Sequence, residues 1–579
     1  MRHLTIIVVV VLLAVSSLAC DRDESATDDP PADQQQADEQ PEEQPDDYDD
    51  DSLYPELQDV DPIEPTDAGP EAPAIYFTSG LKGYTEPCGC TADVLLGGID
   101  RITAFVRDAR QLHPEAVMID AGDWLFEIDE IPEHLQAQEK AKAEVLAGAH
   151  RRMDTEFSVP GNRDLALGVD FYAEMMDKAQ MTPLGANIDL DGESLKGAKK
   201  LELDSQKLLF VGAGDPDSYD AVDGVDVTDD EAAIRDAVGD TDADGTVLVY
   251  QGSAIRAHTL AESVDEIDFV IVGHDPRRQQ DAQPAGDAQL LEAYDQGRYV
   301  GRLKLYGTEH QRPFEDGRAG VLAERQSLDN QIDGVRTDLR RLEVRTEGRR
   351  TSMTERLEER LDDLEQQRAQ LLDDGVEIPD DSPAFLYDLI GMEPGYRLDD
   401  AIEQKRRAYN ERLADFIDEI DREPIAPRDD EPFFVGQDTC ADCHGDAHDF
   451  WKQTSHASAV ETLEVRQKQY DQNCIGCHVD GWEQPGGSVL GNIKYEAELG
   501  GETFTKDLHE VGCESCHGPG SDHVLDPLDD DAQPQHINQH PDANDCTQCH
   551  VPDHSPTFDF EVYVDQITGE GHEYTGGDN

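Results

Sequence analysis

Four copies of the pattern Cys-x-x-Cys-His lie in the last 140 residues of this 579-residue chain. Two thiols three positions apart can both form thioether bonds to the vinyl groups of one haem, and the adjacent histidine can ligate its iron. A zinc ribbon or a set of disulfides would not require a histidine after every second cysteine. We therefore predict four covalently bound haem c groups. The predicted attachment residues are Cys440, Cys443, Cys474, Cys477, Cys513, Cys516, Cys546 and Cys549, and the predicted proximal iron ligands are His444, His478, His517 and His550.

The motifs are closely spaced, with starts 34, 39 and 33 residues apart. So short a segment cannot build an ordinary core around four macrocycles, so the haems themselves must form most of it. Haems packed this closely can exchange electrons. We predict a mainly α or irregular multihaem cytochrome c domain over residues 431–565, followed by a tail over 566–579.

Further residues around the motifs carry a family resemblance. Phe434-Val-Gly, Trp451-x-x-x-Ser-His456-Ala and the stretch from Cys513 to His523-Val resemble the tetrahaem cytochromes c that accept electrons from hydroxylamine oxidation in nitrifying bacteria. The resemblance implies that His456 and His523 are distal iron ligands. Weaker candidates for the same role are His448, His509 and His554. In that family one haem can be five-coordinate, and the sequence does not assign which.

The N-terminus carries an export signal. Residues 1–20 place Arg2 and His3 before an apolar run and small residues before Cys20, which predicts a secretory signal peptide. The end of this segment resembles a lipoprotein cleavage site, with Cys20 as the lipidated residue; a simple signal peptide or an uncleaved anchor are the alternatives. We expect an extracytoplasmic protein, anchored by lipid on the periplasmic face of a bacterial membrane or on the cell surface.

The net charge of −82 is divided between a tether and the folded part. Residues 21–70 hold 20 acidic residues and one base, a composition that cannot pack, so we predict a disordered tether over 21–72. Without it the charge is still −63. Such a surface excludes nucleic acid as a partner, because binding phosphate needs the opposite sign. Only 14 of the 47 basic residues are lysine, which indicates a salt-loving source.

Residues 73–312 alternate short apolar runs with helical stretches, a pattern typical of an α/β domain. The expected buried strands are Ala74–Thr78, Ala116–Ile119, Leu208–Val211, Val247–Tyr250 and Phe269–Val272. Several end in Gly/Asp turns: Asp120-Ala-Gly-Asp123, Pro160-Gly-Asn162-Arg-Asp164 and Val272-Gly-His274-Asp275. Polar residues just past parallel strands are where such sheets build their sites.

The turns resemble those of calcineurin-like metallophosphoesterases of the 5′-nucleotidase and thiosulfohydrolase branch. The resemblance implies an α/β sandwich with a two-metal site, of which Asp123, Asn162 and His274 are retained. Other ligand positions are replaced, and Lys82 and Arg163 bring positive charge that suits an anion. We expect a degraded or rebuilt site that holds at most a single divalent metal and has some affinity for a small oxyanion.

Cys88 and Cys90 are the two cysteines that neither the haem motifs nor the lipidation site account for. They follow the degraded first ligand loop in a Cys-x-Cys pattern. A redox or thiol-reactive site and a purely structural role are both open, and these cysteines are the candidates for catalytic residues.

Residues 313–430 are predicted to connect the two domains. Leucines and other apolar residues recur at 4-3 spacing over Leu328–Leu342 and Leu357–Leu364, with a polar stretch between, which predicts an antiparallel helical hairpin. A third amphipathic helix is expected over about Leu398–Ile420. The hairpin is an ordinary helical linker, or a coiled-coil spacer or dimerisation arm.

The sequence therefore favours a lipid-anchored tetrahaem cytochrome c that carries electrons between redox partner proteins. Its front domain would bind a partner or an anion. One alternative is a multihaem oxidoreductase that acts on a small nitrogen, sulfur or selenium oxyanion. The other is a metal-dependent phosphoesterase or thiosulfohydrolase coupled to the haems.

Overall fold

The computed structural model describes residues 72–88, 95–204, 206–219, 222–239, 242–307, 313–346, 350–379, 382–418, 423–428, 431–490, 492–525, 537–551 and 558–569, with Ile63 and Ser555. All belong to one compact unit that spans 49–579. The expected signal peptide and tether, with Cys20, Cys90 and His554, lie outside the described residues. Among those described, no helix has the length and apolar character needed to cross a membrane.

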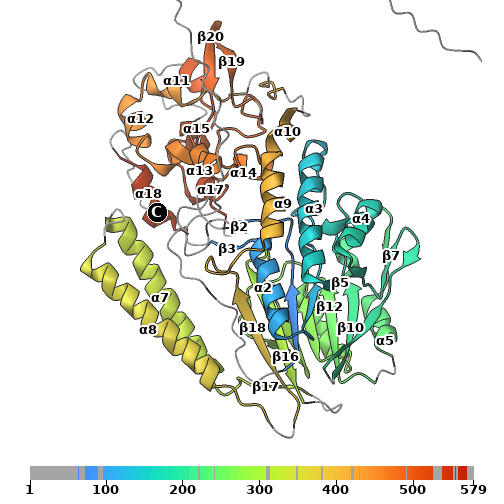
Figure 1. Cartoon of the computed structure of the whole chain (residues 1–579). Helices are drawn as coiled ribbons and strands as arrows, with labels where there is room; N and C mark the ends of the chain where they lie inside the picture. Colours follow the sequence, from blue (N-terminus) through green and yellow to red (C-terminus); the bar gives the residue numbers. More distant parts are fainter. Residues whose placement is uncertain are drawn as a thin grey trace, which may run out of the picture. The chain divides into compact units, whose positions relative to one another are not determined.

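Two β-sheets form the centre of the front domain (Figure 1). The first has seven strands, in the order β17 (Glu315–Asp316), β18 (Ala384–Gly391), β16 (Tyr299–Tyr306), β1 (Ala74–Thr78), β4 (Val117–Asp120), β5 (Thr155–Ser158) and β6 (Thr182–Pro183). The second has six, in the order β14 (Gln283–Ala285), β15 (Ala288–Leu291), β13 (Phe269–Val272), β12 (Gly245–Gln251), β10 (Gln206–Gly214) and β9 (Ala198–Leu203). The central pairs β1–β4 and β10–β12–β13 are parallel.

Aromatic residues of the two sheets meet in a shared core. Phe157 of β5 lies 5.3 Å from Phe210 of β10, and Phe269 of β13 lies 5.4 Å from Phe385 of β18, between ring centroids. Helices α5 (Asp230–Val238) and α6 (Ala254–Ser263) bury apolar residues against the other face of the second sheet. The fold is thus the predicted α/β sandwich, and all five expected strands are confirmed.

The outer face of the first sheet is covered by four helices: α2 (Ile99–Leu112), α3 (Gln136–Met153), α4 (Val169–Ala179) and α9 (Asp400–Glu411). Phe105 of α2 packs edge-on against Tyr76 of β1 at 5.9 Å. Helix α9 begins where Asp399 accepts hydrogen bonds from the backbone N–H groups of Ala401 and Ile402, and α10 (Leu413–Asp418) follows it. These two helices correspond to the third helix expected over Leu398–Ile420.

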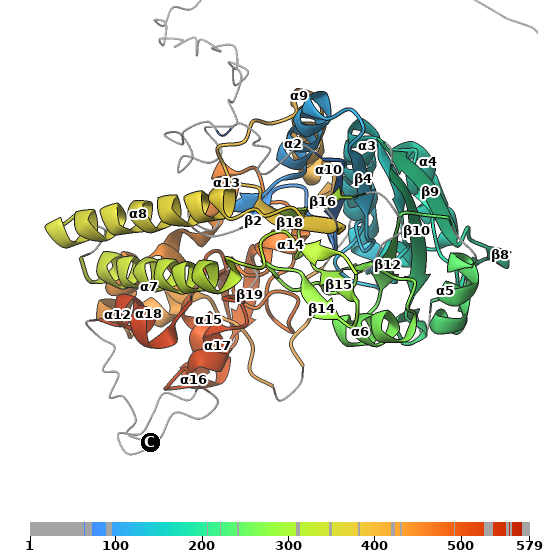
Figure 2. The same ribbon diagram turned by 90° about the horizontal axis from the view of Figure 1, so that it is seen from below.

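The helical hairpin is confirmed, but it is an insertion in the front domain. In the sequence, helices α7 (Leu322–Thr346) and α8 (Ser352–Asp374) come after strand β17 and before strand β18, which are neighbours in the first sheet. The two helices run side by side (Figure 2). Strand β18 pairs with β16 along its whole length. The domain boundary expected at residue 312 is therefore corrected: β18, whose apolar run lies far along the chain, completes the sheet.

The C-terminal region consists of short helices and one hairpin of strands, β19 (Lys494–Leu499) and β20 (Glu502–Asp507). The helices are α11 (Gln437–Ala441), α12 (Gly445–Trp451), α13 (Ala459–Val465), α14 (Gln472–Ile475), α15 (Cys513–His517), α16 (Ser521–Leu525), α17 (Ala543–Cys546) and α18 (Phe560–Ile567). One small buried apolar cluster consists of Val460, Leu463, Ile475, Val479 and Leu490, and a few other apolar residues, such as Phe434 and Leu508, are buried as well. This agrees with the prediction of a mainly α or irregular domain with little apolar core of its own.

Candidate functional site

The third Cys-x-x-Cys-His motif forms helix α15, and each of the other three begins at the end of a short helix and continues into a turn. The backbone N–H of His444 donates to Cys440 O at 2.9 Å, and that of His550 donates to Cys546 O at 3.0 Å. Residues three apart on such a turn share a face, so both thiols of a motif can reach the same macrocycle.

Three motif histidines have a contact at Nδ1. His478 Nδ1 lies 2.6 Å from Ala459 O, His517 Nδ1 lies 2.6 Å from Asn538 O, and His550 Nδ1 lies 3.1 Å from Ser555 Oγ. A backbone carbonyl at this distance accepts a hydrogen bond from Nδ1–H, and a serine hydroxyl can do the same, so Nε2 is left as the ligating atom. The three rings are therefore suited to bind iron through Nε2.

Two further histidines lie opposite motif histidines. The ring centroids of His444 and His523 are 6.2 Å apart with 27° between the planes, and those of His456 and His550 are 6.2 Å apart with 50°. An imidazole nitrogen lies about 2 Å from a metal ion that it ligates, so two rings on opposite sides of one iron have centroids about 6 Å apart. Both pairs fit an iron between them.

The remaining distal candidates have other contacts. His448 is 8% exposed and stacks on Trp451 at 5.4 Å. His509 is half exposed, and its Nδ1 lies 2.8 Å from Asp507 Oδ1. These contacts place neither ring opposite a motif histidine.

The motif cysteines show which haem sites are neighbours. Electrostatic interactions show that Cys440 lies beside Cys513 and that Cys477 lies beside Cys549. Burial and the nearby Cys546 both raise the pKa of the Cys516 thiol, so these two residues are neighbours as well. The four motifs are thus adjacent in the order first, third, fourth, second.

The residues retained from the expected phosphoesterase site lie where parallel strands of both sheets end. Asp123, after β4, contacts His274, which follows β13: Nδ1 and Oδ2 are 2.9 Å apart. Arg163 Nη1 donates to the same carboxylate at 2.8 Å. Asn162 is directed elsewhere, and its Nδ2 donates to Asp129 at 3.4 Å. The structure thus brings together Asp123 and His274, two of the three expected residues. Arg163 binds the same carboxylate of Asp123 that His274 contacts.

A second cation completes this cluster. Lys82 Nζ lies 2.8 Å from Asp295 and 3.1 Å from Asp275, and Arg163 Nη2 lies 3.0 Å from Asp275. Burial opposes the charge on His274, but Asp123 and Asp275 outweigh it and raise the pKa of His274. Lys82 and Arg163 are each shared between two carboxylates of this cluster. The expectation that the two cations would attract an anion is therefore corrected, because both are already neutralised.

The loops of this cluster keep an unusual backbone. Lys82, Asp123 and Asp275 have φ angles of 51°, 53° and 44°, in the left-handed region that side chains other than glycine rarely adopt. Such residues persist only where the surroundings hold them, and they gather at functional sites. The backbone of these loops is thus of the kind found at functional sites.

Two more buried carboxylates, those of Asp120 and Asp164, lie in the same loops, and the sequence interpretation did not assign them a role. Asp120 accepts hydrogen bonds from Thr78 Oγ1 at 2.7 Å and Ser158 Oγ at 2.9 Å, and burial raises its pKa to about 7. Asp164 accepts from four backbone N–H groups: Asp123, Trp124, Leu125 and Gly161. Both occur in the Gly/Asp turns that the sequence singled out, so the turns were the available signal. Asp295 had none.

The donor set does not suit the metal pair that the fold resemblance implied. Lys82 and Arg163 engage Asp123, Asp275 and Asp295, the carboxylates nearest the retained positions. In the part of the chain that the structure describes, no group of three or more His, Cys, Asp or Glu side chains is arranged to hold a metal ion. We assign no step to a metal here.

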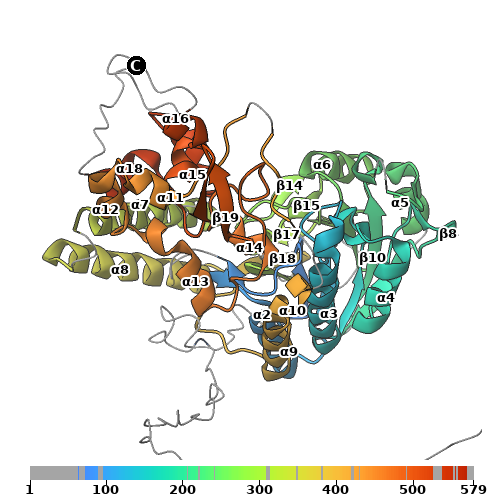
Figure 3. The ribbon, with the colours of Figure 1, turned by 90° about the horizontal axis from the view of Figure 1, so that it is seen from above.

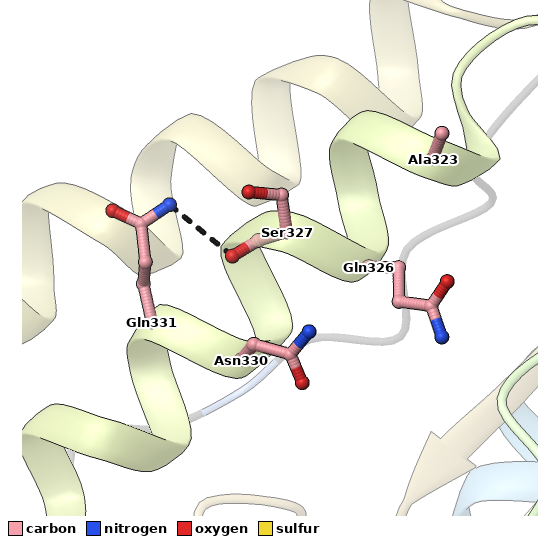
Figure 4. Close-up of a pocket in the computed structure, with 5 residues that line it drawn as sticks. All are labelled: Ala323, Gln326, Ser327, Asn330 and Gln331. Atoms are coloured by element: carbon pink, nitrogen blue, oxygen red, sulfur yellow. Dashed lines mark hydrogen bonds between the residues drawn. The ribbon is translucent and has the colours of Figure 1, made fainter.

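A surface depression lies elsewhere, on helix α7 (Figure 4). Its volume is about 410 Å³, and its described lining consists of Ala323, Gln326, Ser327, Asn330 and Gln331. Gln331 Nε2 donates to the backbone carbonyl of Ser327 at 3.2 Å. With neutral side chains from a single helix, it offers no chemistry of its own.

Sequence comparison agrees with the haem motifs. Residues 439–518 match the profile of the family described as cytochrome c554 and c-prime. The C-terminal region is similar to cytochrome c554. A curated relative, cytochrome c-554 of Nitrosomonas europaea, is 39% identical over 102 residues, which are 15% of this chain and 39% of the relative. The expected resemblance to this cytochrome family is confirmed, over well under half of the relative's length.

Solved structures similar to this chain include two hydrolases. The 5′-nucleotidase precursor of Thermus thermophilus is 14% identical, with 62% of this chain and 61% of that chain covered and a TM-score of 0.41. The sulfate thiohydrolase SoxB of the same organism is also 14% identical, with 62% and 64% covered and a TM-score of 0.42. In both cases the match spans less than two thirds of the other chain.

Proposed function

We propose that this protein is an extracytoplasmic tetrahaem c-type cytochrome that carries electrons between redox partner proteins. The observation that carries the proposal is the pairing of His444 with His523 and of His456 with His550 at 6.2 Å. A chance surface histidine would not lie opposite a motif histidine at the distance that a shared iron needs.

The pairs supply a ligand assignment. His523 would be the distal ligand at the first motif, Cys440–His444, and His456 the distal ligand at the fourth, Cys546–His550. His448, His509 and His554 stay candidates for the haems of the second and third motifs, one of which can be left five-coordinate. The haem irons would supply one-electron transfer, and the paired imidazoles would hold them six-coordinate and closed to substrate.

The adjacency of the motifs gives a path. The haems would form a row in space in the order first, third, fourth and second motif. Electrons would then enter or leave at the two ends of the row, which are the first and second motifs. At the second motif, Asn473 beside Cys474 donates a hydrogen bond to Glu139 of the front domain, so that end of the row is partly covered. We therefore place the docking site for a redox partner at the first motif.

The front domain would act as a module that positions the cytochrome region. Its ion cluster favours neither metal-dependent hydrolysis nor capture of a small oxyanion. Cys88 and Cys90 stay candidates for a redox role. The backbone of Cys88, in strand β2 (Pro87–Cys88), pairs with that of Leu96 in strand β3 (Leu96–Gly97). Lipidation at Cys20 would tie the protein to a membrane.

The proposal is tested by producing the full chain in a bacterium that attaches haem c and counting haem per polypeptide from the pyridine haemochrome spectrum. We expect four. Replacing both cysteines of one motif, as in the double variant Cys546→Ala and Cys549→Ala, should remove one. The double variant Cys88→Ser and Cys90→Ser is the matched control and should retain all four. Wild-type protein with no covalent haem would overturn the proposal.

A further inference from the structure

The second haem motif is held against the front domain by a set of polar contacts. Helix α14, which carries Cys474, lies beside helix α3 (Figure 3), and side-chain hydrogen bonds connect them. Gln138 Nε2 donates to Asp471 Oδ1 at 2.7 Å, and Asn473 Nδ2 donates to Glu139 Oε1 at 2.7 Å. The first of these contacts is fully buried. The docking is therefore specific, because buried polar groups at an interface must be matched to their partners.

Lys468 extends the contact to helix α9. Its Nζ lies 3.0 Å from Asn410 Oδ1, 3.2 Å from Glu86 and 3.2 Å from Asp471, and the residue is only 7% exposed. Glu86 immediately precedes the strand that carries Cys88. On the α3 side, Lys142 pairs with Glu139 at 2.8 Å. Buried cations of both domains thus lie around the segment that leads to Cys474.

One buried group in this interface lacks a partner. Tyr409 of α9 is 3% exposed, its ring lies 5.3 Å beneath the Lys468 ammonium, and its hydroxyl has no hydrogen-bond partner among the described residues. Burial and the charges of Asp471, Glu139 and Glu86, with the thiol of Cys474, raise the pKa of this phenol well above its usual value. It therefore stays a neutral O–H donor. A buried donor without a partner is destabilising, so a partner in the haem-loaded protein is expected.

We propose that the front domain forms one wall of the haem site at Cys474 and Cys477, and that Tyr409 and Lys468 help to set the reduction potential of that haem. The inference rests on haem attachment at this motif. Tyr409 acts as a positioning residue from a domain that the cytochrome region alone does not contain. The front domain would then control the end of the electron path that it covers.

The direction of the effect follows from electrostatics. A reduced haem carries one electron more than an oxidised haem, so a nearby cation or a donated O–H dipole stabilises the reduced form. In a poorly solvated interface such interactions are much stronger than in water. Removal of either group should lower the reduction potential of one haem.

The test is a spectroelectrochemical titration of the full haem-loaded chain. In the variant Tyr409→Phe we expect one of the four midpoint potentials to fall and three to stay in place. A tenfold change in the reduction equilibrium of a single haem is about 59 mV. The matched control is Tyr172→Phe, because Tyr172 is also a buried tyrosine of the front domain whose hydroxyl finds no partner among the described side chains. It lies near Asp164 and Asp120, in the core of the front domain.

A second variant guards against a folding defect. Lys468→Gln should lower the same midpoint as Tyr409→Phe, whereas Lys200→Gln, at an exposed ion pair with Asp242 in the front domain, should leave all four unchanged. Unchanged midpoints in Tyr409→Phe, or an equal shift of all four, would overturn the inference. A wild-type chain with fewer than four haems would instead contradict the proposed function, so the two failures are distinguishable.

Discussion

The rings of His456 and His550 face each other at 6.2 Å, although one follows the first haem motif and the other belongs to the fourth. Phe558 stacks on the other side of His550 at 4.5 Å, and Ser555 lies at its Nδ1. The orientation of this ring is thus fixed by neighbours from its own segment, while its partner comes from a distant one. Burial, with the nearby His550, lowers the pKa of His456, which keeps its imidazole neutral and able to ligate.

Loss of a distal histidine should open one haem. We predict that His523→Ala converts one of the four haems from low-spin to high-spin and allows it to bind CO when reduced. The physical reason is that His523 lies opposite His444 and its removal leaves one coordination position free. Electron paramagnetic resonance and the CO difference spectrum measure the change.

The control for this experiment is His258→Ala, at an exposed histidine on α6 of the front domain. It should leave the spin state of every haem unchanged. If His523→Ala retained the wild-type spectrum and bound no more CO than the control, the ligand assignment at the first motif would be wrong.

Replacement of Lys82 should destabilise the front domain. Its ammonium is shared by Asp295 and Asp275, and removing one partner of a largely buried ion pair costs about 3 kcal/mol because the other charge is left uncompensated. We therefore predict that Lys82→Met lowers the unfolding temperature, followed by circular dichroism. EDTA should leave the wild-type unfolding temperature unchanged, because lysine and arginine hold these carboxylates.

An exposed ion pair provides the comparison. Lys178 pairs with Glu144 and Glu174 on the surface, where such pairs contribute about 0–1 kcal/mol. Lys178→Met should change the unfolding temperature far less than Lys82→Met does. Equal effects of the two variants, or a large loss of stability in EDTA, would contradict the idea that side-chain cations have replaced metal ions.

Local patterns predicted much of the fold, and long-range pairing did not follow from them. The runs at Ala74–Thr78 and Phe269–Val272 were recognisable as strands because they are apolar and bounded by turns. Strand β18 was missed because the hairpin separates it from β17, and nothing in its sequence names β16 as its partner. The helices of the hairpin were predictable from 4-3 spacing alone.

The haem motifs could be recognised from the sequence because covalent attachment depends on two cysteines three positions apart and needs no tertiary information. The distal ligands depended on a resemblance, since spacing cannot say which histidine lies opposite which motif. In the front domain the sequence showed that Lys82 and Arg163 had entered the site. It could not show that Asp295, far along the chain, neutralises Lys82. Charge balance is a property of the fold.

Asp120 should make the stability of the front domain depend on pH. Burial raises its pKa from 3.8 to about 7, so its contribution is fully present below pH 3.8 and is lost as the pH rises towards 7. A shift of about three units corresponds to about 4 kcal/mol. We predict that Asp120→Asn, which keeps one acceptor oxygen and places an uncharged NH2 group where the other oxygen lies, gains stability relative to wild type as the pH is raised from 4 to 8.

The measurement is the difference in unfolding temperature between variant and wild type at each pH, which cancels the titration of all other groups. Asp217→Asn, at an exposed carboxylate of the same domain, should show a nearly constant difference. A constant difference for Asp120→Asn as well would mean that this carboxyl group is ionised throughout the range.

The hairpin should depend on a narrow line of apolar contacts. Leu364 of α8 is 1% exposed and packs with Leu328 and Ile332 of α7. Truncation of a buried leucine costs about 3 kcal/mol, so Leu364→Ala should loosen α7 from α8 and expose both helices to limited proteolysis. Met353→Ala on the same helix, at a side chain that is 51% exposed, is the control and should digest as wild type does. Haem content and the four midpoint potentials should be unchanged in both variants, because the hairpin is an insertion on the front domain's sheet. A loss of haem in Leu364→Ala alone would show instead that the hairpin supports the cytochrome region.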